Sequence, residues 1–312
     1  MSRRAIVLAV ILLLLAAVPP LAAAFNQPFY LELVRRVMIF AIAALSLNLI
    51  LGYGGLISFG HAAYLGIGAY AVGVLAYYGI NNGFLQWALA MVASALVALV
   101  IGAISIRASG IYFIMITLAF TQMLYYLGIS IEEYGGDDGM RLEVKSQFAG
   151  LVDLNNPTAF YYVVLAILIA FLYLGHRLVN SRFGMVIRAA RSNEARTRAI
   201  GFSPYPYRLA AFVIAGAMCG LAGALLVNHT VFLTPEFMNW TRSGELMFMV
   251  IMGGMGTTAG PVLGAFALLL LEDVLSGITA HWQIILGPIL VLVVLFAKRG
   301  LAGLLPGGRE DG

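Results

Sequence analysis

The sequence predicts an all-α polytopic membrane protein with about 8–10 transmembrane helices. Of its 312 residues, 62% are hydrophobic and only 10% are charged, and the mean hydropathy is +0.96. Apolar runs long enough to cross a bilayer recur along the chain. They do not alternate polar and apolar residues, as strands of a lipid-facing β-barrel would. We therefore expect a single transmembrane domain over residues 1–312.

Nine apolar runs define the expected helices. The first, at 5–24, follows Arg3 and Arg4 and also resembles a signal peptide with a cleavage site at 22–24. We favour its retention as a membrane helix. The other runs lie at about 37–51, 61–79, 85–106, 110–131, 160–179, 208–228, 246–271 and 282–297.

Loop charges predict which side of the membrane each loop occupies. The segment 177–208 is rich in arginine and should be cytoplasmic, whereas the acidic loop 132–158 should lie outside. The basic residues Arg3, Arg4, Lys298, Arg299 and Arg309 favour cytoplasmic N- and C-termini. Two further arginines, Arg35 and Arg36, violate this rule, because the helix count places them outside.

Two glycine-rich interruptions are expected at 52–60 and 253–261. The run 246–271 is too short for two full crossings. We expect it to form a re-entrant pair of half-helices that enters and leaves on the outer side, with Gly253–Pro261 at its tip. Paired breaks in two halves point to an internal repeat around a translocation path. Glycines that only let helices pack closely explain the pattern equally well.

The sequence offers little enzymatic chemistry. There is no ATP-binding motif, the four histidines are isolated from one another, and the single cysteine, Cys219, is best explained as a small packing residue. We therefore expect no catalytic residue, no metal site and no cofactor in this chain. The apolar runs also lack the buried charges that an ion-coupled carrier usually needs. A transporter of this composition requires a partner that supplies energy.

A short helix is expected over 193–200, inside the arginine-rich segment. Ser192 is the predicted N-cap, and Gly201 is the predicted C-terminal stop. The negative charge of Glu194 in the first turn should stabilise the helix by its interaction with the positive end of the helix dipole. Pro204 prevents continuation. Such a helix is marginal alone, so a groove on another protein would stabilise it. The predicted contact with an ATPase comprises Arg191, Ser192, Asn193, Glu194, Ala195, Arg198, Gly201 and Pro204.

Seven segments of the chain carry family-like motifs: 52–64, 135–139, 193–201, 207–214, 220–224, 252–261 and 299–303. Taken in order, they resemble the branched-chain amino acid permeases of ATP-binding cassette (ABC) importers. The likeness covers most of the chain. The outer-loop motif at 135–139 and the total length resemble the LivM-type subunit of the leucine/isoleucine/valine uptake system more than its LivH-type partner.

This resemblance implies the remaining components of the importer. It implies a heterodimer with a LivH-type permease, two cytoplasmic ATPases that bind ATP and Mg, and an outer substrate-binding protein. The chain would be a multi-pass protein of the bacterial cytoplasmic (inner) membrane, with no nucleic-acid partner.

The resulting functional prediction is uptake of leucine, isoleucine and valine. Permeases with the same motifs carry urea, amides or other amino acids, and these cargos stay open. A self-sufficient channel or ion-coupled carrier is the alternative from another class. The polar residues expected along the translocation path are Ser58, His61, Tyr64, Thr117, Gln122 and Thr257.

Overall fold

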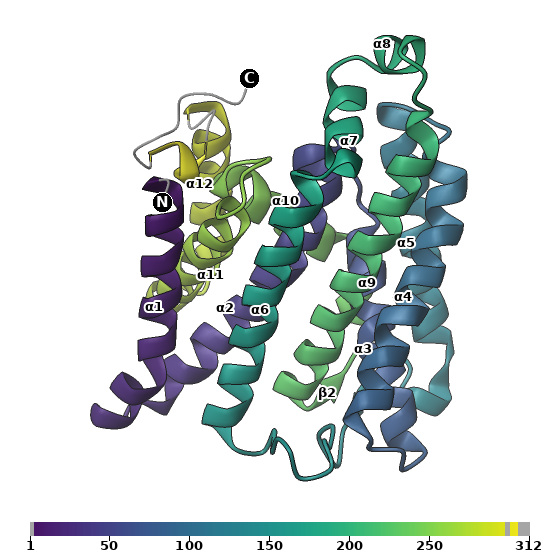
Figure 1. Cartoon of the computed structure of the whole chain (residues 1–312). Helices are drawn as coiled ribbons and strands as arrows, with labels where there is room; N and C mark the ends of the chain where they lie inside the picture. Colours follow the sequence, from purple (N-terminus) through teal and green to yellow (C-terminus); the bar gives the residue numbers. More distant parts are fainter. Residues whose placement is uncertain (1–2, 297–299, 305–312) are drawn as a thin grey trace.

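The computed structural model describes residues 3–296 and 300–304, and this part of the chain is almost entirely helical (Figure 1). Lys298, Arg299 and Arg309 lie outside the described residues. The helices are α1 (Arg3–Ala24), α2 (Pro28–Asn48), α3 (His61–Tyr77), α4 (Gly83–Ser105), α5 (Ile111–Ser130), α6 (Pro157–Val179), α7 (Arg182–Ser192), α8 (Glu194–Ala199), α9 (Pro204–Thr230), α10 (Trp240–Gly253), α11 (Gly260–Ile278) and α12 (Trp282–Phe296).

The short elements matter because several of them interrupt membrane helices. Two strands, β1 (Met140–Arg141) and β2 (Phe232–Leu233), pair in antiparallel fashion. A π-helix, η1 (Leu49–Tyr53), continues α2, and three short 3₁₀ helices are η2 (Glu132–Tyr134), η3 (Pro235–Met238) and η4 (Leu301–Leu304).

Six described helices are long and apolar enough to cross a membrane: α2 with η1, α4, α5, α6, α9 and α11. Shorter apolar helices lie at 9–24, 61–77 and 282–293. The all-α polytopic fold class is thus confirmed. Retention of residues 1–24 stays a prediction. Within the fold, α1 packs on α6, where the Tyr161 hydroxyl donates to the Leu15 carbonyl at 2.7 Å.

The bundle has two distinct ends (Figure 1). The upper end in the figure carries α7 and α8, which belong to the arginine-rich segment 177–208; we call this segment the coupling loop and this end the coupling-loop end. At the long-loop end lies the segment 131–156, which carries β1 and pairs with β2. This loop begins α6 with an N-cap, because the Asn156 side chain accepts from the backbone N–H of Thr158 at 3.0 Å.

The first break in the helices lies between α2 and α3. After η1 the chain loses helical structure over 54–60, and α3 begins at His61. Neighbouring helices satisfy the freed backbone: Thr117 of α5 accepts from the Phe59 N–H at 3.3 Å, and Thr121 donates to the Phe59 carbonyl at 3.0 Å. Non-helical backbone at membrane depth is tolerated only when protein satisfies it in this way.

A second break separates α9 from α10 and spans 231–239. It contains β2 and η3, and Val231 adopts a left-handed φ of 53°. The two breaks meet: the rings of Phe59 and Trp240 are 6.2 Å apart. Ser243 joins them, donating to the Phe59 carbonyl at 2.7 Å and accepting from the Ala62 N–H at 2.9 Å. The starts of α3 and α10 therefore face each other inside the bundle.

The expected re-entrant pair at 246–271 is wrong. The turn 254–259 lies at the coupling-loop end, where the Gly256 N–H and the Thr257 carbonyl bond to Asn48, at the end of α2. Both α10 and α11 extend beyond the apolar run, so residues 240–278 supply one broken and one complete crossing. The glycines serve a tight turn. The break that matches 54–60 is 231–239, which has no glycine to announce it.

Helix α9 is the central element and packs on α2, α3 and α4. A side chain at Gly220 would collide with Ser94 of α4, and one at Gly223 would collide with the Leu65 carbonyl of α3. These glycines therefore allow backbone-to-backbone packing. Cys219 is fully buried on the same helix and its Sγ lies 3.4 Å from the His61 carbonyl, consistent with the packing role expected for it.

Candidate functional site

The coupling loop (residues 177–208) folds into two helices, of which the sequence predicted one. Helix α7 begins at Ser181, whose hydroxyl accepts from the Gly184 N–H at 3.4 Å. Its buried face, with Val186, Ile187 and Ala190, packs on the bundle. Arg182 and Arg188 are exposed on the other face of this short amphipathic helix, and their charge hid its helical pattern.

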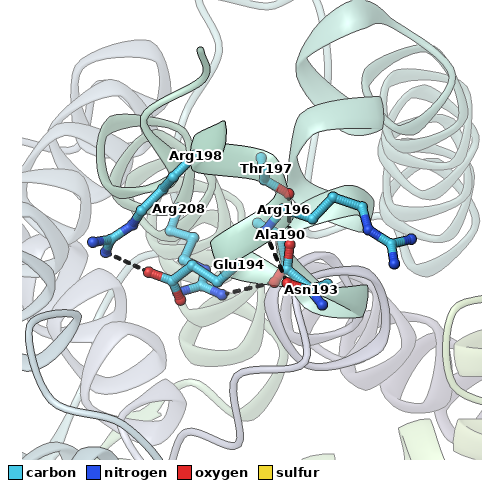
Figure 2. Close-up of polar contacts among 7 residues, drawn as sticks. All are labelled: Ala190, Asn193, Glu194, Arg196, Thr197, Arg198 and Arg208. Atoms are coloured by element: carbon cyan, nitrogen blue, oxygen red, sulfur yellow. Dashed lines mark hydrogen bonds and ion pairs between the residues drawn. The ribbon is translucent and has the colours of Figure 1, made fainter. Parts of the chain in front are cut away.

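Helix α8 is capped by Asn193 and not by Ser192 (Figure 2). The Asn193 side chain accepts from the Arg196 N–H at 2.8 Å, and Asn193 has the extended backbone of an N-cap. Ser192 is still helical, as the last residue of α7. The prediction of Ser192 as cap is therefore wrong by one residue, because the preceding helix already includes it.

Glu194 ties α8 to the bundle (Figure 2). One carboxylate oxygen accepts from Arg198 at 2.6 Å, and the other accepts from Arg208, in α9, at 2.7 Å. Burial raises the pKa of this carboxyl, but the hydrogen bonds and charges of Arg208 and Arg198 outweigh it and hold the pKa below its ordinary value. Arg208 also donates to the Ala190 carbonyl at 3.2 Å, so one guanidinium joins α7, α8 and α9.

The end of α8 is a Schellman motif. The Gly201 N–H bonds to the Arg198 carbonyl at 2.9 Å, and the Phe202 N–H bonds to the Thr197 carbonyl at 3.2 Å. Gly201 has a φ of 92°, which favours glycine. Gly201 therefore ends α8, as the sequence predicted.

The prolines after α8 start the next helix. Pro204 is buried at the first turn of α9, and Pro206 follows in the same turn. Proline is tolerated there because the first helical N–H groups have no intrahelical acceptor. The helix expected over 208–228 therefore begins four residues earlier than predicted.

Arg191 connects the coupling loop to the first break. Its guanidinium donates to the Gly52 carbonyl in η1, and its aliphatic chain lies against Gly55. Asn48, one turn before Gly52, bonds to the α10–α11 turn through Gly256 and Thr257, at 2.9 and 3.0 Å. Contacts on two successive turns of one helix, at Asn48 and at Gly52, therefore connect the α10–α11 turn with α7. We call these contacts the Arg191–Asn48 link.

Four of the six predicted path residues gather around the first break, and all four are buried: Ser58, His61, Tyr64 and Thr117. The Ser58 hydroxyl accepts from the Gly60 N–H at 3.0 Å. The His61 and Tyr64 rings are in edge contact at 5.5 Å between centroids. Within the described residues, the two ring nitrogens of His61 and the Tyr64 hydroxyl have no hydrogen-bond partner.

The other two path residues lie elsewhere. Thr257 belongs to the α10–α11 turn, where its hydroxyl donates to the Gly254 carbonyl at 2.8 Å. Gln122 is on α5, and no hydrogen bond joins it to the cluster at the first break. The structure thus divides the six residues among three places, and their role in a path stays a prediction.

Sequence reasoning missed residues that hold the breaks together. Ser243 and Asn48 are buried polar side chains in otherwise apolar segments, which was a readable signal. Arg208 was noted only as a positive charge. No local pattern could pair it with Glu194, fourteen positions away. In the described part of the chain, no group of three or more potential metal ligands comes together.

These features define the class as a polytopic helical membrane protein with paired broken helices and a structured basic loop. The family described as branched-chain amino acid transport system / permease component matches residues 29–295, and the chain belongs to this family.

Individual relatives agree with this assignment. The chain is 28% identical, over 86% of its length and 69% of the relative, to the high-affinity branched-chain amino acid transport system permease protein LivM of Salmonella typhimurium. It is 26% identical, over 86% of its length and 90% of the relative, to a probable LivM of Methanocaldococcus jannaschii. An autoinducer 2 import system permease protein, LsrC of Yersinia pseudotuberculosis, is 27% identical over 70% of this chain and 64% of its own length. No solved structure matches the chain.

Proposed function

We propose that this chain is the LivM-type permease subunit of an ABC importer that carries branched-chain amino acids across the bacterial inner membrane. A LivH-type permease completes the membrane part. Two ATPases, which bind ATP and Mg, dock on the coupling-loop end, which is cytoplasmic together with both termini. A substrate-binding protein delivers cargo to the long-loop end.

The observation that carries this proposal is the construction of α8. A helix of six residues is too short to be stable by itself. This one has an Asn193 cap, a Schellman end and a carboxylate fixed to α9. Beside these contacts it presents apolar surface to solvent, with Ile200 65% and Phe202 43% exposed. A rigid projecting helix with an exposed apolar edge suits a groove on an ATPase.

The Arg191–Asn48 link supports transmission from that groove into the membrane. Movement of α7 displaces Arg191, which is bonded to the carbonyl of Gly52. The same displacement reaches the α10–α11 turn through Asn48. ATP can shift the balance between two conformations only through its differential affinity for them. The link thus joins the loop to the first break and to the α10–α11 turn, which is the connection that such coupling requires.

The cargo proposal rests on the relatives. LivM of Salmonella typhimurium is described as a branched-chain amino acid permease, and its similarity spans most of this chain. Radiolabelled leucine uptake, with isoleucine, valine, urea and short amides as competitors, tests it directly. We expect competition by the two aliphatic amino acids alone. Stronger competition by urea or an amide would contradict the proposed cargo but not the proposal that the chain belongs to an importer.

The double variant Glu194→Arg with Gly201→Val tests the coupling role. It places a third cation beside Arg198 and Arg208 and forces a branched residue into a left-handed φ. We expect normal membrane insertion, continued ATP hydrolysis by the assembled transporter and loss of uptake.

Arg196→Gln is the matched control, since it removes an exposed arginine of α8 that makes no side-chain contact with Glu194 (Figure 2). It should retain uptake. Normal uptake by the double variant would contradict the coupling role. Leucine transport by the purified chain alone would contradict the need for an ATPase.

A further inference from the structure

Arg36 is a charged side chain within a membrane-spanning helix. It lies eight residues after Pro28, the first residue of α2, which at 1.5 Å per residue is about 12 Å along the helix axis. Its neighbour Arg35 is fully engaged, donating to the His229 ring at 3.0 Å and lying over the Phe160 ring at 4.7 Å. Within the described residues, Arg36 makes no hydrogen bond or ion pair; its guanidinium lies 5.9 Å from the centre of the Phe40 ring and within electrostatic range of Glu272.

The Arg36 side chain lines a cavity of about 120 Å³ between α2, α3, α9, η3 and α10. Its apolar wall comprises Phe40, Leu65, Leu226 and Phe237, and Arg242 is a second cation on its lining. An apolar cavity of about 150 Å³ holds the six carbons of benzene. The present cavity therefore suffices for the four carbons of a leucine side chain.

Two carboxylates lie close to the arginines of this cavity, although neither is on its lining, and of the two only Glu245 is bonded to an arginine. Glu245 accepts from Arg242 at 2.8 Å, so this pair is already neutral. Glu272, in α11, is within electrostatic range of Arg36, Arg242 and Glu245, and has no hydrogen-bond partner in the described part of the chain. Among the described residues, the Arg36 guanidinium and the Glu272 carboxylate thus make no hydrogen bonds and can bind a ligand.

We propose that this cavity binds an aliphatic amino acid in transit, a proposal that rests on the function inferred above. Arg36 binds the carboxylate, Glu272 binds the ammonium group, and the apolar wall holds the side chain. Among the described residues, Arg36 and Glu272 have opposite charges but are not bonded to each other. A zwitterion supplies a hydrogen-bonded partner to both, which lowers the cost of holding two charges at membrane depth. Guanidinium–carboxylate hydrogen bonds are also among the strongest in proteins.

The two charges and the apolar wall, taken together, select the same class of ligand. A free fatty acid would leave Glu272 unpaired, and an amine would leave Arg36 unpaired. Urea has no aliphatic group for the wall of Phe40, Leu65 and Leu226. An amino acid with an apolar side chain matches all three requirements.

Equilibrium binding of radiolabelled L-leucine to the assembled transporter in nanodiscs, without the binding protein, tests this site. In the wild type, unlabelled leucine should compete at least tenfold better than leucinamide, which lacks the carboxylate, or isocaproate, which lacks the ammonium group. Arg36→Gln should weaken leucine binding at least tenfold and remove the preference over leucinamide. Glu272→Gln should weaken binding similarly and remove the preference over isocaproate. Arg36→Lys should restore part of the affinity.

Arg141→Gln is the matched control, because it removes an exposed arginine in the long loop, away from the cavity lining. It should bind leucine as the wild type does. Unchanged affinity in both Arg36→Gln and Glu272→Gln would overturn the site. So would the absence of leucine binding by a wild-type transporter that imports leucine. Either result leaves the proposed importer function intact. Import of another cargo alone would instead refute the proposal that the transporter carries branched-chain amino acids.

Discussion

Two groups of arginines in this molecule have the same charge and opposite surroundings. In the coupling loop, Arg198 and Arg208 converge on Glu194, so cations of an exposed loop become structural ties. In α2, Arg35 is 3% exposed and fully bonded, whereas the adjacent Arg36 lines a cavity without a hydrogen-bonded partner among the described residues. Position relative to the membrane therefore does not decide the role of an arginine. Its role depends on whether nearby hydrogen-bond acceptors are available to bond to its guanidinium.

The largest expected effect comes from separating Arg35 from Arg36. Arg35→Ala leaves the His229 ring and the Pro157 carbonyl without their donor and should cost about 3 kcal/mol of stability. Arg36→Ala removes no hydrogen bond and should cost less than about 1 kcal/mol. Thermal melting of the two variants in nanodiscs measures the difference. Equal losses would show that the two arginines are equivalent.

The next effect concerns the Arg191–Asn48 link. Asn48→Ala removes hydrogen bonds to Gly256 and to the Thr257 carbonyl and should destabilise the α10–α11 turn by about 2 kcal/mol. We expect faster amide exchange over 254–259 and weaker coupling of ATP hydrolysis to uptake. The control is Ser46→Ala, because Ser46 is a buried polar residue of the same helix that bonds to the Ala43 carbonyl and to Cys219 of α9 and not to the turn. Unaltered exchange in the turn would exclude the link.

A smaller effect tests which residue caps α8. Asn193→Ala should cost about 1 kcal/mol in the local stability of α8, and Ser192→Ala should cost almost nothing, because only Asn193 accepts from the Arg196 N–H. Amide exchange of residues 196–199 provides the readout. A larger effect from Ser192→Ala would restore the sequence-based assignment of the cap.

The smallest effect is a dependence on pH. Because the folded pKa of Glu194 lies below its ordinary value of 4.5, its contribution is complete above that value and disappears as the pH falls through the lowered pKa. We expect protection of α8 to be constant from neutral pH down to 4.5 and to fall below it, after correction for intrinsic exchange. Glu194→Gln should remove this dependence. A loss of protection already at pH 6 would point to another group.

Hydropathy predicted the membrane helices because their existence depends on length and apolarity alone. It placed the start of α2 nine residues late, since the first half of that helix carries Arg35 and Arg36. It missed α7, whose exposed face is basic, and placed the second break at 253–261 because glycine was the only signal available. The actual break at 231–239 depends on β2 pairing with β1, a contact between segments about 90 positions apart.

In the candidate site, too, local features were predictable from the sequence and contacts between helices were not. The limits of α8 followed from local signals, Glu194 at its start and Gly201 at its end. The Glu194–Arg208 pair and the Gly52 carbonyl beneath Arg191 depend on how separate helices pack, which no spacing encodes. The cluster of Ser58, His61, Tyr64 and Thr117 was found as polar residues in apolar segments, without its geometry.

The small-residue face of α9 has a mechanical consequence. At Gly220 and Gly223 the surfaces of α4 and α3 reach the α9 backbone itself, so no layer of flexible side chains remains to absorb sliding. Helices in such contact shift together or not at all. We therefore expect relative movement of helices at the contacts between this closely packed core of α3, α4 and α9 and the remaining helices. Glycines, which have no side chain, therefore form the contacts that hold α3, α4 and α9 together as one unit.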